Sequence, residues 1–149
     1  SWSLYASQRV GGSGRVLAID LKEISQNFPR NVTVVQGDAF DVDSETLGQF
    51  APYDVVLSDM APKTSGVRLR DQAMSYELFE RALEVGFTLG TKGSSSLVCK
   101  ILMGPDFDQA VALAKKYYAK TRIIRPAGVR SNSKEVFLVG LGLREEVPD

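Results

Sequence analysis

Short runs of apolar and β-branched residues alternate with stretches of helical periodicity, and this alternation limits the possible fold more than any other feature of the chain. Runs without polar alternation are typical of strands covered on both faces, as in a parallel sheet. Strands that alternate with helices indicate a doubly wound α/β sheet. The expected strands of this kind cover residues 15–19, 32–35, 54–57 and 95–101.

Helices are expected between these strands. Apolar residues spaced by three and four predict the longest one from Asp71 to about Leu89. Ser44 is expected to cap a short helix that runs to Phe50. Further helices are expected over residues 2–9 and 105–118.

The end of the chain has a different pattern. Two apolar segments, 121–125 and 135–143, are joined by a loop without helical periodicity, so we expect them to pair as antiparallel strands. With 149 residues the chain has the length of one compact domain, and residues 1–149 are expected to form a single domain.

The residue types present exclude several kinds of chemistry. There is no histidine, and Cys99 is the single cysteine. A Ser-His-Asp triad, a Cys-His pair, a multi-cysteine metal site and a disulfide framework are therefore excluded. No apolar run approaches the ~20 residues that a membrane span needs. Carboxylates, lysines, hydroxyls or a bound cofactor must carry any chemistry, and we expect no metal.

Charge is balanced overall but unevenly distributed. The sequence has 18 basic and 18 acidic residues. Residues 1–63 contain eight acidic and five basic residues, whereas residues 115–134 contain seven basic residues and no acidic one. This distribution suggests a polarised surface, and a solvated helix face followed by an ordinary strand is the alternative.

Three successive strands are each followed by an aspartate, at the end where open α/β sheets bind ligands: Asp20, Asp38 and Asp59. Asp20 is positioned to accept hydrogen bonds from an adenosine ribose, although NAD enzymes place an acid there too and a loop aspartate is often a turn former. Asp38, on the neighbouring strand, suits an adenine amino group. The combination points to S-adenosylmethionine.

The segment Ser58–Pro62 is more specific, and with it the chain resembles the FtsJ-type ribose 2′-O-methyltransferases, whose bacterial founding member modifies large-subunit ribosomal RNA. The resemblance implies a Rossmann-like, S-adenosylmethionine-dependent methyltransferase sheet, mostly parallel, with a C-terminal antiparallel hairpin. The matching segments are residues 1–3, 18–21, 36–38, 57–62, 98–101 and 130–139.

The resemblance also implies a catalytic Lys-Asp-Lys-Glu tetrad, of which Asp59, Lys100 and Glu135 are three members. The first lysine, the glycine loop and the first strand of the family would precede Ser1, so we expect the native protein to be longer. In the family the second lysine is taken as the proton acceptor. We expect Lys100 to orient the hydroxyl and stabilise the developing alkoxide instead, because two neighbouring carboxylates would raise its pKa.

Each of these residues also has an ordinary structural interpretation. Lys100 could reach solvent from a strand end, Glu135 could be a solubilising charge on an edge strand, and Trp2 could be a core residue. The residues expected to bind the cofactor are Trp2, Asp20, Asp38 and Asp59. The residues expected to contact RNA phosphates are Lys63, Arg68, Arg130 and Lys134.

The resemblance therefore implies methyl transfer from S-adenosyl-L-methionine to a ribose 2′-hydroxyl of RNA, with large-subunit ribosomal RNA as the first candidate substrate. We expect a cytoplasmic monomer without a membrane partner. Within the same chemistry, tRNA and the mRNA cap are alternative substrates. A nucleotide-binding oxidoreductase and a non-catalytic RNA-binding scaffold are alternatives from other classes.

Overall fold

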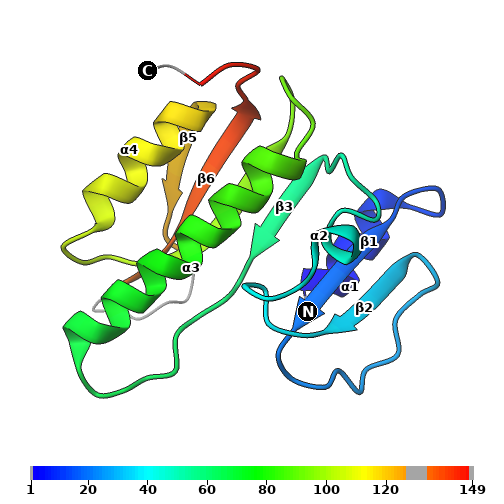
Figure 1. The fold of residues 1–149 in the computed structure, drawn as a ribbon, viewed down its shortest axis with the longest axis horizontal. Coiled ribbons are helices and arrows are strands. Elements are labelled where there is room, and N and C mark those ends of the chain that lie inside the picture. Colours follow the sequence, from blue (N-terminus) through cyan, green and yellow to red (C-terminus); the bar gives the residue numbers. More distant parts are fainter. Residues whose placement is uncertain (1, 127–133, 148–149) are drawn as a thin grey trace. The chain divides into compact units, whose positions relative to one another are not determined.

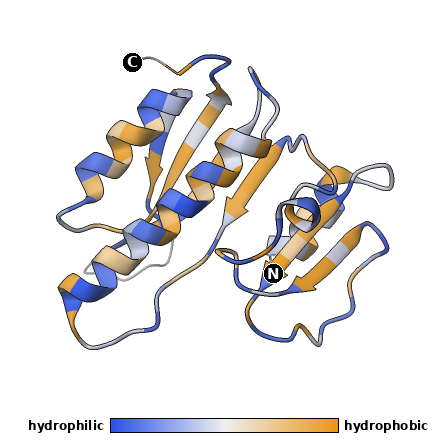
Figure 2. Ribbon diagram, viewed as in Figure 1, coloured by the Kyte–Doolittle hydropathy of each residue, from blue (hydrophilic) through white to orange (hydrophobic). Residues whose placement is uncertain are grey.

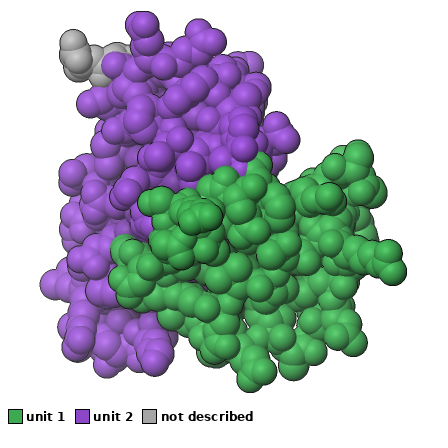
Figure 3. Space-filling model, turned by 45° about the vertical axis from the view of Figure 1, so that its right-hand side comes forward, with its two compact units in different colours: residues 1–50 green, residues 51–149 purple. Residues whose placement is uncertain are grey.

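The structure is a computed structural model that describes residues 2–126 and 134–147. It divides into two compact units, residues 1–50 (unit 1) and residues 51–149 (unit 2), coloured separately in Figure 3. That residues 1–149 form a single domain stays a prediction.

Unit 1 is built around a parallel pair of strands. Its elements are α1 (Trp2–Val10), β1 (Val16–Asp20), β2 (Val32–Gln36) and α2 (Ser44–Leu47). Strands β1 and β2 pair in register, with Asp20 opposite Gln36 at the end of the ladder. The buried Ser7 hydroxyl of α1 donates to Asn31 Oδ1 over 2.6 Å and so ties the helix to the loop before β2.

The cap of α2 differs from the prediction by one residue. Asp43, not Ser44, is the N-cap, and its carboxylate accepts a hydrogen bond from the Thr46 N–H over 2.7 Å. Serine and aspartate are about equally good at this position, so the sequence alone does not decide between two adjacent candidates.

Unit 2 is a four-stranded sheet with the order β3-β4-β6-β5 (Figure 1). Strands β3 and β4 are parallel, and β6 is antiparallel to both β4 and β5. The predicted antiparallel pairing at the end of the chain is thus confirmed, and three of the four strands run in the same direction. Its elements are β3 (Val55–Ser58), α3 (Arg68–Leu89), β4 (Ser96–Leu102), α4 (Phe107–Tyr117), β5 (Tyr118–Ile124) and β6 (Glu135–Leu143).

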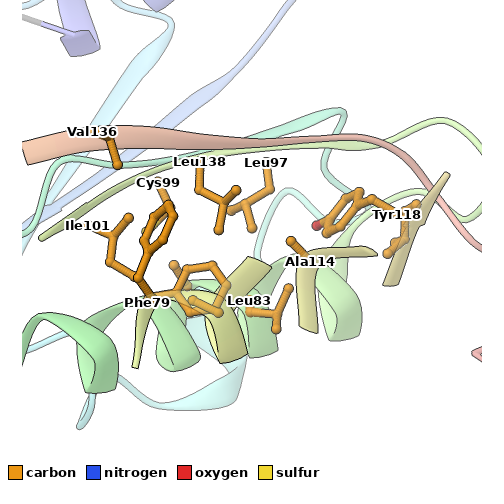
Figure 4. Packing of buried hydrophobic residues seen from close by; sticks show 13 residues of the cluster. Phe79, Leu83, Leu97, Cys99, Ile101, Ala114, Tyr118, Val136 and Leu138 are labelled. Carbon is orange, nitrogen blue, oxygen red and sulfur yellow. The ribbon is translucent and has the colours of Figure 1, made fainter. Parts of the chain in front are cut away.

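Helices α3 and α4 cover one face of this sheet. Figure 2 shows hydrophobic strands, and helices on which hydrophobic and hydrophilic positions alternate. Every second residue of β4 points toward the helices, and Figure 4 shows Cys99 and Ile101 directed at Phe79 of α3. Within the described residues, no helix combines the length and the apolar character that crossing a membrane requires.

The opposite face of β3 departs from the expectation of strands covered on both sides. Val55 is 52% exposed and Leu57 42% exposed, whereas Ser58 is buried and Val56 packs against the core. Side chains alternate across a strand, so the apolar run 54–57 supplies both a packed and an exposed face.

Two glycines allow a buried aromatic ring to pack. A Cβ at Gly86 would lie 2.6 Å from the Tyr118 hydroxyl, and a Cβ at Gly140 would lie 2.6 Å from the Tyr118 ring. Tyr118 is fully buried at the junction of α4 and β5. Only residues without a side chain leave space for it on both sides.

Cys99 provides a direct test of this packing. The side chain is fully buried, and burial raises the pKa of its thiol from 9.0 to about 12, against a smaller lowering by Ser58. We expect no reaction with a thiol reagent at neutral pH in the folded protein and complete reaction in denaturant, because the thiolate is the reactive form. Rapid labelling of folded protein would contradict the packing of β4 against α3.

The same raised pKa gives a pH dependence of folding. The unfolded thiol loses its proton above pH 9.0, whereas the folded one keeps it until about pH 12. The contribution of Cys99 to stability is therefore complete below pH 9.0 and is lost as the pH rises toward 12.

Candidate active site

Strand register brings Asp59, Lys100 and Glu135 together at one edge of the unit 2 sheet. Ser58 lies opposite Cys99, so Asp59 and Lys100 follow side by side on the parallel strands β3 and β4. Glu135, the first residue of β6, lies opposite Leu102 and on the same face of the sheet as Lys100. Three segments that are distant in sequence therefore bring one ammonium group and two carboxylates close together.

The three side chains form two ion pairs. Lys100 Nζ lies 2.5 Å from Asp59 Oδ1 and 3.2 Å from Glu135 Oε1. The lysine side chain is 22% exposed, whereas the two carboxylate side chains are 51% and 43% exposed. Both distances allow charge-assisted hydrogen bonds, so the carboxylates fix the position of the ammonium group.

The charge state of Lys100 follows from this geometry. Burial by itself would lower the pKa of the ammonium group, because desolvation disfavours charge. The hydrogen bonds and negative charges of Asp59 and Glu135 outweigh burial and raise the pKa of Lys100 above its ordinary value of 10.5. Lys100 is therefore a cation at neutral pH, which suits charge stabilisation better than proton abstraction.

A cavity of about 180 Å³ adjoins this cluster. Its walls come from the segment after Asp59, from the first turns of α3 and from the ends of β4 and β6. Because Lys100 and Glu135 belong to the lining, a bound group is in direct reach of the ammonium ion. The lining residues are Met60, Ala61, Pro62, Thr64, Asp71, Ser75, Lys100, Leu102 and Glu135.

Two polar residues of this lining, Asp71 and Ser75, were not singled out from the sequence. They continue the buried stripe of Phe79 and Leu83 toward the start of α3 at intervals of four residues. A polar residue in an otherwise apolar stripe was the available signal. The Ser75 hydroxyl accepts a hydrogen bond from the Leu102 N–H over 2.9 Å.

A further α3 side chain holds the end of β4. Gln72 Nε2 donates to the Met103 carbonyl over 2.9 Å, and the Met103 N–H donates to the Lys134 carbonyl over 2.8 Å. These bonds connect the strand that carries Lys100 both to α3 and to the residue before Glu135.

In unit 1, the structure brings Asp20 and Asp38 to the same end of the parallel pair. Asp20 ends β1, and Asp38 follows β2 by two residues. Asp20 Oδ1 accepts from the Lys22 N–H over 3.0 Å, and Asp38 Oδ1 accepts from the Phe40 N–H over 2.9 Å. Trp2 is half-buried in the first turn of α1. Asp59 belongs to unit 2, whereas the other predicted cofactor residues belong to unit 1. That Asp59 also contacts the cofactor stays a prediction.

The predicted RNA contacts are placed as follows. Lys63 and Arg68 are exposed in the segment between β3 and α3 and at the start of α3, and Lys134 is exposed immediately before β6. Arg130 lies outside the described residues. Over residues 2–126 and 134–147, no group of three or more His, Cys, Asp or Glu side chains could hold a metal ion.

The chain is similar in sequence or in fold to several known proteins. A chain from Plasmodium falciparum, described as a ribosomal RNA methyltransferase, has the same fold, with a TM-score of 0.74 over 91% of this chain and 76% of its own, at 20% identity. A ribosomal RNA large subunit methyltransferase E from Sorangium cellulosum is 52% identical over 95% of this chain. The protein of the same name from Nitratidesulfovibrio vulgaris strain DP4 is 45% identical over 97% of this chain.

The chain spans 66% of the length of the first relative and 72% of the second. The family model described as FtsJ-like methyltransferase matches residues 1–143, nearly the whole chain. The predicted resemblance is thus confirmed, and the chain belongs to the FtsJ-like methyltransferase family.

Proposed function

We propose that this protein transfers a methyl group from S-adenosyl-L-methionine to a ribose 2′-hydroxyl of RNA, with large-subunit ribosomal RNA as its substrate. The observation that carries the proposal is the placement of Lys100 between Asp59 and Glu135 beside a cavity. The names of the two relatives support the choice of RNA. With a ribosomal substrate, we expect the protein to act in the cytoplasm.

Lys100 is suited to assist the attacking oxygen. An ammonium group has three N–H donors. Asp59 and Glu135 accept two of them, and the third has no partner among the residues that the structure describes. Directed into the cavity, this donor holds the 2′-oxygen in line for attack and stabilises the negative charge that develops there. The new O–CH3 bond forms as the S–CH3 bond of the cofactor breaks and leaves a neutral thioether. The hydroxyl proton passes to water, which reaches the partly exposed carboxylates beside Lys100.

The cavity also limits what can bind next to Lys100. Pockets for whole small-molecule ligands usually measure ~300–1,000 Å³. A volume of about 180 Å³ is suited to a single ribose rather than to a complete nucleotide. The base and the phosphates would then lie outside it, where exposed Lys63, Arg68 and Lys134 are available for phosphate contacts.

The carboxylates of unit 1 fit the cofactor chemically. Carboxylates accept hydrogen bonds from hydroxyl and amino groups, and each of these two still has acceptor capacity beyond its one backbone bond. Asp20 would hold the ribose hydroxyls of the cofactor and Asp38 the adenine amino group, with Trp2 and Asp59 as the further contacts we expect. When bound, the cofactor supplies the electrophilic methyl group.

Labelling of RNA tests the proposed function. The protein is incubated with methyl-labelled S-adenosylmethionine and either isolated large ribosomal subunits or tRNA. We expect label in large-subunit RNA, in a dinucleotide that resists alkaline cleavage, because a methylated 2′-oxygen can no longer attack the neighbouring phosphate. Label in tRNA alone would keep the chemistry and change the substrate. Cofactor binding without label in any RNA would contradict the proposal.

A further inference from the structure

The segment between Asp59 and α3 forms a wall of the cavity, although little of it is buried. Met60, Pro62 and Thr64 line the cavity, and residues 63–70 are all exposed. The part before α3 has no helix or strand pairing to fix it. Its position must therefore depend on specific polar contacts.

Asp71 supplies these contacts. The Ser65 N–H donates to Asp71 Oδ1 over 3.1 Å and to Oδ2 over 3.3 Å, and the Ser65 hydroxyl donates to Oδ1 over 2.7 Å. The same hydroxyl accepts from the Val67 N–H over 3.1 Å. Gly66, with φ of +83°, makes the turn between them in a conformation that favours glycine.

The carboxylate of Asp71 is anchored on a rigid element. Asp71 lies in the first turn of α3, one residue before Gln72 and four before Ser75, which hold the main chain at the end of β4. One helix end thus binds both the segment that follows Asp59 and the end of the strand that carries Lys100. The two sides of the cavity are set relative to each other by α3.

The geometry points to Asp71 as a positioning residue for methyl transfer: by holding Ser65, it fixes segment 60–66 as the wall against which the acceptor ribose is seated. The inference rests on the proposed function, because it concerns the same cavity. Asp71 acts through Ser65 and not through Lys100, whose ion pairs are with Asp59 and Glu135.

Substitutions at both ends of this contact separate a positioning role from a direct one. We expect Asp71→Ala to lower kcat/KM for RNA by about 10²-fold, since small misplacements of a substrate have effects of that size. Asp71→Asn keeps the Oδ1 acceptor, and we expect it to retain activity within about threefold of the parent. The KM for S-adenosylmethionine should be unchanged in both.

Ser65→Ala, alone and combined with Asp71→Ala, gives a double-mutant cycle for the contact between the two residues. It removes one of the bonds to Asp71, and we expect a loss of about tenfold in kcat/KM for RNA in the parent but no further loss in the Asp71→Ala background, because residues in one network are not additive. Glu77→Ala, which removes an exposed carboxylate from the same helix, is the matched control and should behave like the parent.

Two activity results would overturn the inference. Parent-like kcat/KM in Asp71→Ala would show that Ser65 needs no anchor. A loss in both Asp71→Ala and Asp71→Asn, with Ser65→Ala unaffected, would assign Asp71 a direct role through its charge.

Hydrogen exchange of the protein without substrate gives a readout that does not need activity. We expect the amide of Ser65 to exchange at least about tenfold faster in Asp71→Ala than in the parent and the Glu77→Ala control. If the parent methylates no RNA, the proposed function fails, whereas this measurement still decides whether Asp71 anchors Ser65. Unchanged exchange at Ser65 would overturn the inference.

Discussion

Replacing Lys100 by alanine is expected to lower kcat for methyl transfer by about 10³-fold, the upper end of the loss seen when one donor to a developing oxyanion is removed. The reason is that Lys100 is the cation at the cavity, held by two carboxylates and kept charged by them. The Kd for S-adenosylmethionine should stay within about twofold of the parent, because the missing interaction forms at the attacking oxygen. Single-turnover rates with labelled cofactor, together with equilibrium binding of the cofactor, measure both quantities.

Lys116→Ala is the matched control, since it removes an exposed lysine from the last turn of α4. Similar losses in the two variants would contradict a special role for Lys100.

The pH dependence of kcat/KM in the parent protein gives a second check on the role of Lys100. A lysine with a raised pKa stays charged through neutrality, so we expect no Lys100-dependent rise in kcat/KM near pH ~7. Such a rise would instead identify Lys100 as the proton acceptor.

Replacing Phe79 by alanine is expected to lower the free energy of unfolding by about 3–5 kcal/mol. The Phe79 ring is fully buried at the centre of the cluster that α3 forms with β4 and β6. Truncation removes apolar contact and leaves a cavity between two rigid layers, which can relax only in part. Urea denaturation followed by far-ultraviolet circular dichroism measures the loss.

Leu69→Ala provides the comparison for this prediction. Leu69 belongs to the same helix but is 66% exposed, and we expect its replacement to change the free energy of unfolding by no more than about 0.5 kcal/mol. Equal effects of the two substitutions would show that α3 does not bury the face described above.

The strands of unit 2 were predictable from the sequence pattern, whereas the grouping of Asp59, Lys100 and Glu135 was expected from the family resemblance. Continuous apolar runs placed β3 and β4, and parallel strands must end at the same edge of a sheet. Adjacent parallel pairing then places Asp59 beside Lys100, and an antiparallel last strand places Glu135 at the same edge. The roles of these residues stay predictions, as do the cofactor and RNA contacts.

Helix and strand ends were less predictable, for identifiable reasons. Helix α3 begins at Arg68 and not at Asp71, because residues 68–70 are all exposed and give no apolar periodicity. Val67, its N-cap, makes no side-chain capping bond that would mark the start. Strand β5 begins at Tyr118 and not at Thr121, because α4 passes into it directly, without a glycine or proline between them.

The hydrogen bonds by which α3 anchors segment 60–66 and the end of β4 could not be predicted from the sequence. Asp71 and Ser65 are six residues apart, and Gln72 is 31 residues from its partner Met103. Most of these bonds involve main-chain atoms. Because nearly every residue type has the same main-chain groups, the identity of the residue does not indicate such a bond. The sequence shows only polar side chains near the start of a helix, which solvent exposure explains equally well.

The hydrogen bonds between α3 and the end of β4 bear on how this cavity can change in evolution. Ser75 accepts a hydrogen bond from the Leu102 N–H, and Gln72 donates one to the Met103 carbonyl. Both partners are main-chain groups, so any residue at position 102 except proline would still form these bonds. Leu102 lines the cavity, and its side chain can therefore be exchanged without releasing the strand that carries Lys100. Under the proposed function, we expect substitutions of Leu102 to change which acceptor the cavity admits while Asp59, Lys100 and Glu135 keep their positions.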